Sequence, residues 1–335
     1  METRIVFSDI DGTIMHSLED LEEGAASRLT DGSYLLTPPS ASGRQGVIST
    51  RTLRQVASLR RQGVLCVIIT GARLSTLLMR LPFLPAADAF VCENGGRVFY
   101  PGSPHPSACP LSEDLGWRAQ QVAAGPPQQD ACAPGARQGA LWEWFRSLEA
   151  QAWSLDASGY TTSFRVHARG GKSVEALQEL IRSAPDCLAC SWNLGAADFY
   201  PATSGKVRAA QYLMGRFRAT PHSCTFMCDD DNDMELAAMV AKAFLPTVTS
   251  ESVRQAVAQR PGQFVVARAK GTTATEEMLD AVAQHYGLQG EGGEEGQGRG
   301  QGEVEGQAAA GQEEEVTGEA AAAVPPAASE VLVPT

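Results

Sequence analysis

The chain has 335 residues, of which 43% are hydrophobic and 20% charged, and this composition is typical of a globular protein of up to two domains. No apolar run approaches the roughly 20 residues that span a bilayer, and the first predicted strand leaves no room for a targeting segment, so we expect a cytoplasmic protein without a membrane partner. The net charge of −12 lies mostly in residues 290–335, and the rest shows no basic stripe, which argues against a nucleic-acid partner.

The first element that the sequence predicts is a buried parallel strand over residues 5–8, because this run is apolar and rich in strand formers. It ends in Asp9 and Asp11, and two carboxylates so close together repel each other unless a cation or a shared proton compensates them. Residues 16–46 are polar with Gly and Pro-Pro, which predicts a loop or flap beside the aspartates. Ser49 is the expected N-cap of the first helix.

Two further apolar strands are predicted over residues 64–69 and 89–92. The first ends in Thr70-Gly71 and is followed by a predicted helix over 74–81. Residues 93–96 read Glu-Asn-Gly-Gly, which predicts a hairpin turn because Asn-Gly tolerates positive φ.

Residues 101–136 are crowded with Pro and Gly and predict a domain boundary or a variable loop. A helix is expected over 141–153. Alternating strands over 160–167 and 191–200 flank another helix over 173–182. Alternation is typical of antiparallel strands with one exposed face, so we expect a separate, more antiparallel domain here.

A helix is expected from residue 205, followed by a buried strand over 225–228 that ends in the acidic run 229–233. The remaining predicted elements are helices from residue 234 and over 252–258 and 271–285, with strands at 243–245 and 264–266. Residues 290–335 contain ten glutamates, one arginine and no aromatic residue. Such a segment cannot bury enough apolar surface to offset its ordering entropy, so we expect a disordered acidic tail.

Three predicted parallel strands therefore end in polar clusters, which can converge because their carboxyl ends lie along one edge of the sheet. Converging carboxylates need a divalent cation, and oxygen ligands without His or Cys select Mg²⁺. Taken alone, Thr70-Gly71 is more typical of a strand-ending turn, Lys206 of a solvated side chain, and the acidic run 229–233 of helix capping. Together, a nucleophilic carboxylate, a hydroxyl, a lysine and Mg²⁺ indicate phosphoryl transfer.

Four motifs carry a family resemblance: Asp9-Ile-Asp11-Gly12-Thr13, Thr70-Gly71, Lys206, and Asp229-x-x-Asn232-Asp233. In this order they resemble the motifs of the haloacid dehalogenase (HAD) superfamily, and most closely its Cof-type and sucrose-phosphatase-like branch, which includes uncharacterised plant and algal members. The resemblance covers about residues 4–287. It implies an α/β fold in which a Rossmann-like parallel sheet forms the core and an α/β cap is inserted between the second and third motifs. The expected domains are the core at 1–100 and 204–289, the cap at 101–203, and the tail at 290–335.

The resemblance also implies roles for individual residues. Asp9 would attack phosphorus and form an aspartyl-phosphate, and Asp11 would act as the general acid and then as the general base. Thr70 would hydrogen-bond a phosphoryl oxygen, and Lys206 would neutralise charge on the intermediate. The implied Mg²⁺ ligands are Asp9, the backbone carbonyl of Asp11, Asp229 and, as a ligand or a partner of one, Asp233.

Further candidates for substrate contact lie beside these motifs and on the expected cap. They are Thr13, Gly71, Arg73, Asn94 and Asn232 in the core, and Arg165, His167, Lys172 and Asn193 in the cap. Strand alternation would place Arg165, His167 and Arg169 on one face, a pattern that is more typical of a solvated basic surface than of a sugar or anion contact. Two departures from the family pattern stand out: Asp230 adds a charge in the fourth motif, and the arginine of Thr-Gly-Arg is displaced by one residue to Arg73.

The expected function is a Mg²⁺-dependent phosphatase acting on a small phosphorylated metabolite such as a sugar phosphate. Two alternatives remain open at this point: a phosphotransferase or mutase on the same fold, and a non-catalytic member that binds Mg²⁺ or a ligand. The eight cysteines are expected to be mostly buried free thiols, with a redox or zinc role open only for the pair Cys187 and Cys190.

Overall fold

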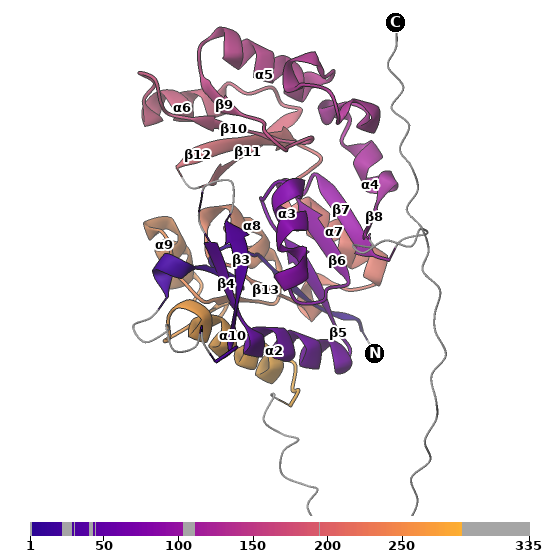
Figure 1. The fold of residues 1–335 in the computed structure, drawn as a ribbon, viewed down its shortest axis with the longest axis vertical. Coiled ribbons are helices and arrows are strands. Elements are labelled where there is room, and N and C mark those ends of the chain that lie inside the picture. The colour runs from indigo at the N-terminus through magenta and orange to yellow at the C-terminus, as the bar shows by residue number, and fades with distance from the viewer. Residues whose placement is uncertain are drawn as a thin grey trace, which may run out of the picture. The chain divides into compact units, whose positions relative to one another are not determined.

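The computed structural model describes residues 2–21, 29, 31–39, 43, 45–102, 111–193 and 195–289. They form an eight-stranded sheet, a four-stranded sheet and a three-stranded sheet, with helices packed on the two larger ones (Figure 1). The predicted disordered tail at 290–335 lies outside the described residues.

The large sheet has the strand order β15-β14-β13-β1-β5-β6-β7-β8. Its first six strands are parallel, and β7 and β8 are antiparallel to their neighbours. Along this order the strands are Phe264–Val266, Lys242–Leu245, Cys224–Met227, Arg4–Ser8, Val64–Ile69, Ala89–Cys92, Arg97–Pro101 and Leu111–Glu113. The parallel strands are mostly buried on both faces, as their continuous apolar runs predict.

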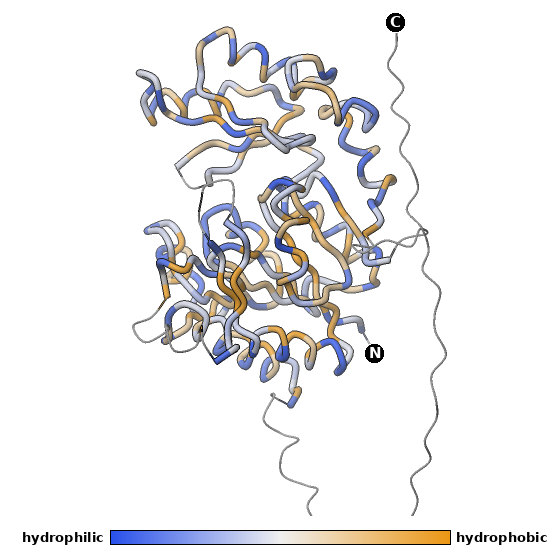
Figure 2. The backbone as a smooth tube through the Cα atoms, viewed as in Figure 1, coloured by the Kyte–Doolittle hydropathy of each residue, from blue (hydrophilic) through white to orange (hydrophobic). Residues whose placement is uncertain are grey.

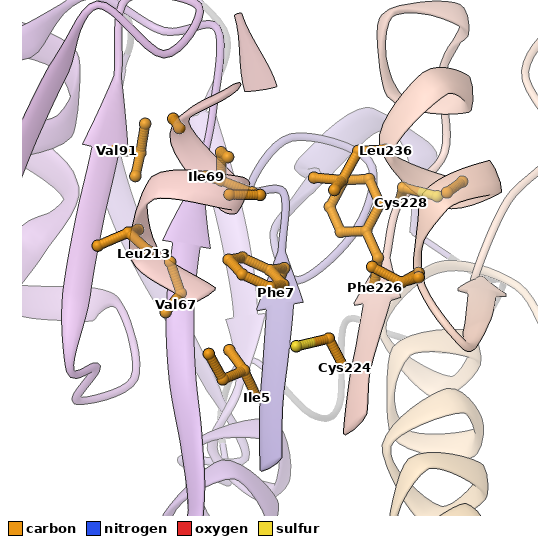
Figure 3. Close-up of a cluster of buried hydrophobic side chains, with 14 of the residues drawn as sticks. Ile5, Phe7, Val67, Ile69, Val91, Leu213, Cys224, Phe226, Cys228 and Leu236 are labelled. Atoms are coloured by element: carbon orange, nitrogen blue, oxygen red, sulfur yellow. The ribbon is translucent and has the colours of Figure 1, made fainter. Parts of the chain in front are cut away.

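Helices cover both faces of this sheet. One face packs against α7 (Lys206–Phe217), α8 (Met234–Met239) and α9 (Glu251–Gln259), and the other against α2 (Thr50–Arg61), α3 (Leu74–Arg80) and α10 (Gly271–His285). Strand periodicity explains the two layers, since alternate residues of β1 point to opposite faces. Figure 3 shows Ile5 and Phe7 of β1 beside Leu213 of α7 and Leu236 of α8, whereas Val6 belongs to the opposite cluster. Ser49 caps α2 as predicted, accepting from the Arg51 backbone N–H at 3.0 Å.

The four-stranded sheet is antiparallel, as its alternating sequence predicts, with the order β11-β12-β10-β9. Its strands are Leu188–Asn193, Ala196–Pro201, Phe164–His167 and Ser154–Asp156, and one face packs against α5 (Ala140–Ala150) and α6 (Val174–Arg182). The strand predicted over 191–200 is in fact a hairpin, because the chain reverses beside Gly195, whose φ is +73°. The strand predicted over 160–167 begins only at Phe164. It ends at His167, so Arg169 lies beyond its end.

Residues 16–46 were predicted to form a loop or flap, and the loop is wrong for the part that the structure describes, which contains strands. β2 (His16–Ser17), β4 (Gln45–Ser49) and β3 (Tyr34–Pro39) form the three-stranded antiparallel sheet. Although the sequence here is rich in Gly and Pro, it contains short runs of strand-forming residues, and these runs pair with each other. Leu36 of β3, for example, lies opposite Val47 of β4.

The segment predicted as a boundary or loop over 101–136 contains β8, α4 (Leu115–Gln120) and several short 3₁₀ helices. Figure 2 shows hydrophobic residues concentrated along the strands of the large sheet. Among the described residues, no helix is both long and apolar enough to cross a membrane. The described cysteines are free thiols, and neither Cys187 nor Cys190 belongs to a metal-binding group in this part of the chain.

Candidate active site

The ends of three neighbouring strands bring together the polar residues that the sequence singled out. Asp9 follows β1, Thr70 follows β5, and Asp229 follows β13 and Cys228. The Asp9 backbone N–H donates to the Met227 carbonyl at 3.0 Å, which fixes β1 against β13. Strand order therefore places these side chains at one edge of the sheet, where open α/β sheets bind ligands.

Three buried carboxylates and one lysine form the centre of this edge. One carboxylate oxygen each from Asp9, Asp229 and Asp233 lies within 4.8 Å of the other two. Asp233 ends the 3₁₀ helix η7 (Asp231–Asp233) and is fully buried. Lys206, the first residue of α7, donates from Nζ to Asp9 Oδ2 at 2.9 Å and to Asp233 Oδ1 at 2.5 Å.

The charges of this centre do not balance. Burial, followed by the nearby Asp9 and Asp233 carboxylates, raises the pKa of Asp229 well above its usual value. Burial also raises the pKa of Asp233, although the contact with Lys206 opposes that shift. Burial alone would lower the pKa of Lys206, but the Asp233 and Asp9 carboxylates raise it overall, so the ammonium stays protonated. The three carboxylates can all be ionised only at a cost that one ammonium does not offset, and a divalent cation would offset it.

The donor set at this centre fits Mg²⁺. It consists of carboxylate oxygens from Asp9, Asp229 and Asp233, without His or Cys. Asp233 Oδ2 is buried and has no hydrogen-bond partner among the described residues. A buried carboxylate oxygen without a partner is costly, and a bound cation would satisfy it.

The residues after the first strand hold Asp229 in place. Thr13 Oγ1 donates to Asp229 Oδ1 at 2.9 Å, so the structure shows Thr13 bound to a carboxylate of its own chain. Gly12 has a φ of +75°, and a Cβ atom there would lie 2.1 Å from Asp229 Oδ2. Only glycine fits this position, because it tolerates the left-handed conformation and leaves room for the carboxylate.

Asp11 lies apart from the three carboxylates. Its side chain is 59% exposed and accepts from Nη1 of the buried Arg80 at 2.6 Å. Of the implied metal ligands, Asp11 is therefore absent from the carboxylate cluster that the structure shows, and its backbone carbonyl stays a predicted ligand. Sequence reasoning missed Arg80, since nothing in the sequence distinguishes it from any other arginine near the end of a helix.

Thr70 and Gly71 are buried at the end of β5, and Thr70 Oγ1 accepts from the Ala72 N–H at 3.1 Å. The displaced Arg73 turns away from this position. Its Nη2 donates to Asp156 of β9 at 2.8 Å, and its guanidinium lies 4.9 Å from the ring centre of Tyr160.

The other substrate candidates lie in the four-stranded sheet or beside it. Arg165 pairs with Asp198 through two hydrogen bonds of 2.6 and 2.8 Å, and Asn94 Nδ2 lies 3.5 Å from the same carboxylate. His167 is half-buried, and burial lowers its pKa. Lys172 lies over the Trp153 ring at 5.0 Å.

Two asparagine candidates complete the set. Asn193 ends β11, and its side chain lies outside the described part of the structure. Asn232 lies in η7 beside Asp233, and its Oδ1 is buried without a hydrogen-bond partner among the described residues. Of the two, Asn232 is therefore the one that the structure shows next to the carboxylate cluster.

Comparison with known proteins now decides the family. A family model described as sucrose-6F-phosphate phosphohydrolase matches residues 2–287. The chain belongs to this family. No curated protein sequence matches the chain.

Solved structures show the same fold. The sucrose-phosphatase from Synechocystis sp. PCC6803, solved with sucrose and phosphate, has a TM-score of 0.56 and 14% identity, over 86% of this chain and 99% of that one. BT1666 from Bacteroides thetaiotaomicron, described among HAD phosphatases, has a TM-score of 0.54 and 14% identity, over 85% and 96%. The HAD-like hydrolase YhjK from Bacillus subtilis has a TM-score of 0.52 and 10% identity, over 86% and 93%. The family and the α/β HAD-like fold identify the chain as a phosphatase and confirm the resemblance read from its motifs.

In this member of the sucrose-6F-phosphate phosphohydrolase family, the extra acidic residues of the fourth motif contact hydroxyl groups. Asp230 Oδ1 accepts from Thr249 at 3.0 Å, and Asp231 Oδ1 accepts from Ser250 at 2.7 Å and from Ser252 at 2.5 Å. These contacts direct both carboxylates toward the segment before and at the start of α9.

A cavity of about 530 Å³ opens beside Asp231. Residues 140–201, which contain the four-stranded sheet and its helices and are called the four-stranded unit below, contribute Gln178 and Trp192 to the lining. The segments η7, α8 and α9 beside the large sheet contribute Asp231, Met234, Ser252 and Ala256. Sequence reasoning missed this cavity, because residues 178, 192 and 231 belong to three separate elements whose contact no local pattern reveals.

Proposed function

We propose that the chain is a Mg²⁺-dependent phosphatase that hydrolyses a sugar phosphate through an aspartyl-phosphate on Asp9. The observation that carries this proposal is the buried Asp9 carboxylate, which binds Lys206 at 2.9 Å. It lies with the carboxylates of Asp229 and Asp233, one from the end of β13 and the other from the turn that follows. A carboxylate nucleophile beside fixed positive charge is what phosphoryl transfer requires.

In the first step, an oxygen of the Asp9 carboxylate bonds to phosphorus while the bond to the leaving sugar oxygen breaks. The carboxylate is already oriented, because Asp9 Oδ1 accepts from the Ile10 N–H at 2.7 Å and Oδ2 accepts from Lys206. Lys206 remains protonated and offsets charge on the transferred group. Thr70 donates a hydrogen bond from its hydroxyl to a phosphoryl oxygen, because its Oγ1 accepts from the Ala72 N–H and leaves the hydroxyl hydrogen free to do so.

Asp11 moves protons in both halves of the reaction. Its carboxylate accepts from Arg80, which directs it, and an ionised carboxylate is the form that takes a proton from the hydrolytic water. To protonate the leaving sugar oxygen in the first half, Asp11 must hold a proton before the sugar leaves, and it regains one from the water in the second half.

Mg²⁺ would be held by Asp9, Asp229 and Asp233, with the Asp11 carbonyl as the further ligand implied by the motif. When bound, the ion supplies positive charge at the phosphoryl group. The unpartnered Asp233 Oδ2 and the unbalanced charge of the cluster support this assignment.

Residues 1–100 and 204–289 would form the core, and 101–203 the cap that covers the site. The antiparallel sheet within 154–201 and the cavity that it shares with η7 support this division. The cavity combines apolar surface from Trp192 and Met234 with polar groups from Asp231, Gln178 and Ser252, a mixture suited to a sugar. The Synechocystis structure with sucrose and phosphate points to the same class of ligand.

The test measures phosphate release from sucrose 6F-phosphate, other sugar phosphates and an aryl phosphate, with Mg²⁺ and with chelator. We expect activity only with Mg²⁺, a preference for a sugar phosphate, and loss of at least about a thousand-fold in Asp9→Asn. Asp88→Asn is the matched control, since Asp88 pairs with Arg60 away from the cluster. Equal activity of wild type and Asp9→Asn would exclude the mechanism, and transfer to an added sugar in preference to water would identify a phosphotransferase.

A further inference from the structure

The turn after β6 contains a carboxylate whose partners come from the four-stranded unit. Glu93, Asn94 and Gly95 have φ angles of 53°, 54° and 86°, so three successive residues are left-handed. Glu93 is fully buried, and its Oε2 accepts from the Thr161 N–H at 2.8 Å, the Thr162 N–H at 2.7 Å and the Thr162 hydroxyl at 2.8 Å. Thr161 and Thr162 lie between β9 and β10.

The same turn holds the segment that follows Thr70. The Glu93 N–H donates to the Ala72 carbonyl at 2.8 Å, and the Ala72 N–H donates to Thr70 Oγ1 at 3.1 Å. The next residue, Arg73, reaches Asp156 of β9. The segment 70–73 is therefore hydrogen-bonded to the turn through Ala72 and to the four-stranded sheet through Arg73.

The turn also holds the residue that precedes Lys206. The Asn94 carbonyl accepts from the Gly205 N–H at 2.9 Å and from the Ser204 hydroxyl at 3.1 Å. The two backbones approach so closely that a Cβ atom on Gly95 would lie 2.4 Å from the Gly205 oxygen. Since Lys206 begins α7 directly after Gly205, the conformation of the turn sets where the lysine enters the site.

We propose that Glu93 is a positioning residue that places both Thr70 and Lys206, and that it does so only while its carboxylate is bound by Thr161 and Thr162. The left-handed conformation is unfavourable for glutamate, and a buried carboxylate without donors is more unfavourable still. The threonine amides supply those donors. The four-stranded unit thus orders the catalytic side chains from a distance, in addition to any contact with substrate. This inference rests on the proposed function, which gives Thr70 and Lys206 their roles.

The test uses Glu93→Gln, which keeps the size of the side chain but replaces the charged acceptor of three hydrogen bonds with a neutral amide oxygen, so that these bonds weaken. Two quantities are measured: the dissociation constant of inorganic phosphate with Mg²⁺ by calorimetry, and kcat and KM for an aryl phosphate. We expect phosphate binding to weaken at least ten-fold and kcat to fall at least ten-fold. Asp88→Asn is the control for stability, because the same Asp/Glu-to-amide change weakens partly buried contacts to Arg60 and to the Cys66 N–H in the same sheet.

A second pair of variants keeps the test decisive if Glu93→Gln does not fold. Thr162→Val removes one donor to Glu93 and keeps the backbone contact, while Thr162→Ser keeps both. We expect weaker phosphate binding in Thr162→Val and recovery in Thr162→Ser. Phosphate binding unchanged in Glu93→Gln, or in Thr162→Val if the former is unfolded, would overturn the inference. A wild-type protein that neither binds phosphate nor releases it would instead overturn the proposed function, and the inference with it.

Discussion

Arg80 Nη1 lies 2.6 Å from Asp11 Oδ2, and this contact joins a buried guanidinium to an exposed carboxylate. Arg80 comes from the last turn of α3, whereas Asp11 follows β1. The arginine thereby fixes the direction of a side chain that the solvent would otherwise leave free to rotate. The proposed acid and base is thus oriented by a residue outside the four motifs.

We expect Arg80→Met to lower kcat about ten-fold with little change in KM, because a proton-transfer group that loses its orientation loses part of its roughly 100- to 10,000-fold contribution. Arg80→Lys should retain more activity than Arg80→Met. Steady-state kinetics with an aryl phosphate measure both. Arg60→Met is the matched control, since it breaks the ion pair with Asp88 in the same sheet. An unchanged kcat in Arg80→Met, alongside an inactive Asp11→Asn, would show that Arg80 does not position Asp11.

Lys206 offers a prediction with a readout independent of activity. Its ammonium lies against Asp9 and Asp233 and competes with a cation for their charge. We expect Lys206→Met to lose activity and yet bind Mg²⁺ at least ten-fold more tightly. The substitution removes the ammonium charge that repels the ion from a few ångströms away, and this repulsion exceeds about 1.4 kcal/mol even at an effective dielectric of 20. Calorimetric titration with Mg²⁺ measures this. Weaker Mg²⁺ binding in Lys206→Met would place the ion away from these carboxylates.

The sequence predicts the parts of the site that depend on strand ends, and misses those that depend on contacts between distant segments. Continuous apolar runs indicate buried parallel strands, and a parallel sheet aligns their carboxyl ends, so Asp9, Thr70 and Asp229 were expected to converge. The structure places them on adjoining strands. Their catalytic roles stay predictions.

Arginine partners could not be predicted in the same way. Arg73 and Arg165 were both expected to contact substrate, and the structure binds them to Asp156 and Asp198. Periodicity tells which face of an element a side chain occupies, but it does not tell which residue of another element lies opposite. The antiparallel sheet within residues 16–49 was missed for a related reason, since pairing between short strands outweighed a turn-rich composition.

Removal of Mg²⁺ should lower thermal stability, because the carboxylate cluster then keeps its repulsion. At Mg²⁺ one hundred times above its dissociation constant, binding contributes about 2.7 kcal/mol. Burial and the neighbouring carboxylates raise the pKa of Asp229, so its carboxyl opposes folding near neutral pH, and we expect the metal-free Asp229→Asn variant to be more stable than the metal-free wild type. Its stabilisation by Mg²⁺ should shrink at the same time.

Thermal unfolding with Mg²⁺ and with chelator measures both effects. Asp231→Asn provides the control, since Asp231 belongs to the same acidic run but binds Ser250 and Ser252. The control should respond to Mg²⁺ as the wild type does. If Asp229→Asn and Asp231→Asn responded alike, the ion would not be bound by the cluster that contains Asp229.

Trp192 provides the prediction that separates sugar recognition from phosphate chemistry. It is half-buried, and it lines the cavity together with Asp231 and Gln178. If the sugar occupies this cavity, Trp192→Ala should raise KM for the preferred sugar phosphate about ten-fold or more, because an aromatic face is lost, and leave the KM of an aryl phosphate nearly unchanged. Trp144→Phe is the control, since Trp144 packs against Phe199 within the four-stranded unit. An equal loss with both substrates would mean that Trp192 supports the fold and that the sugar binds elsewhere.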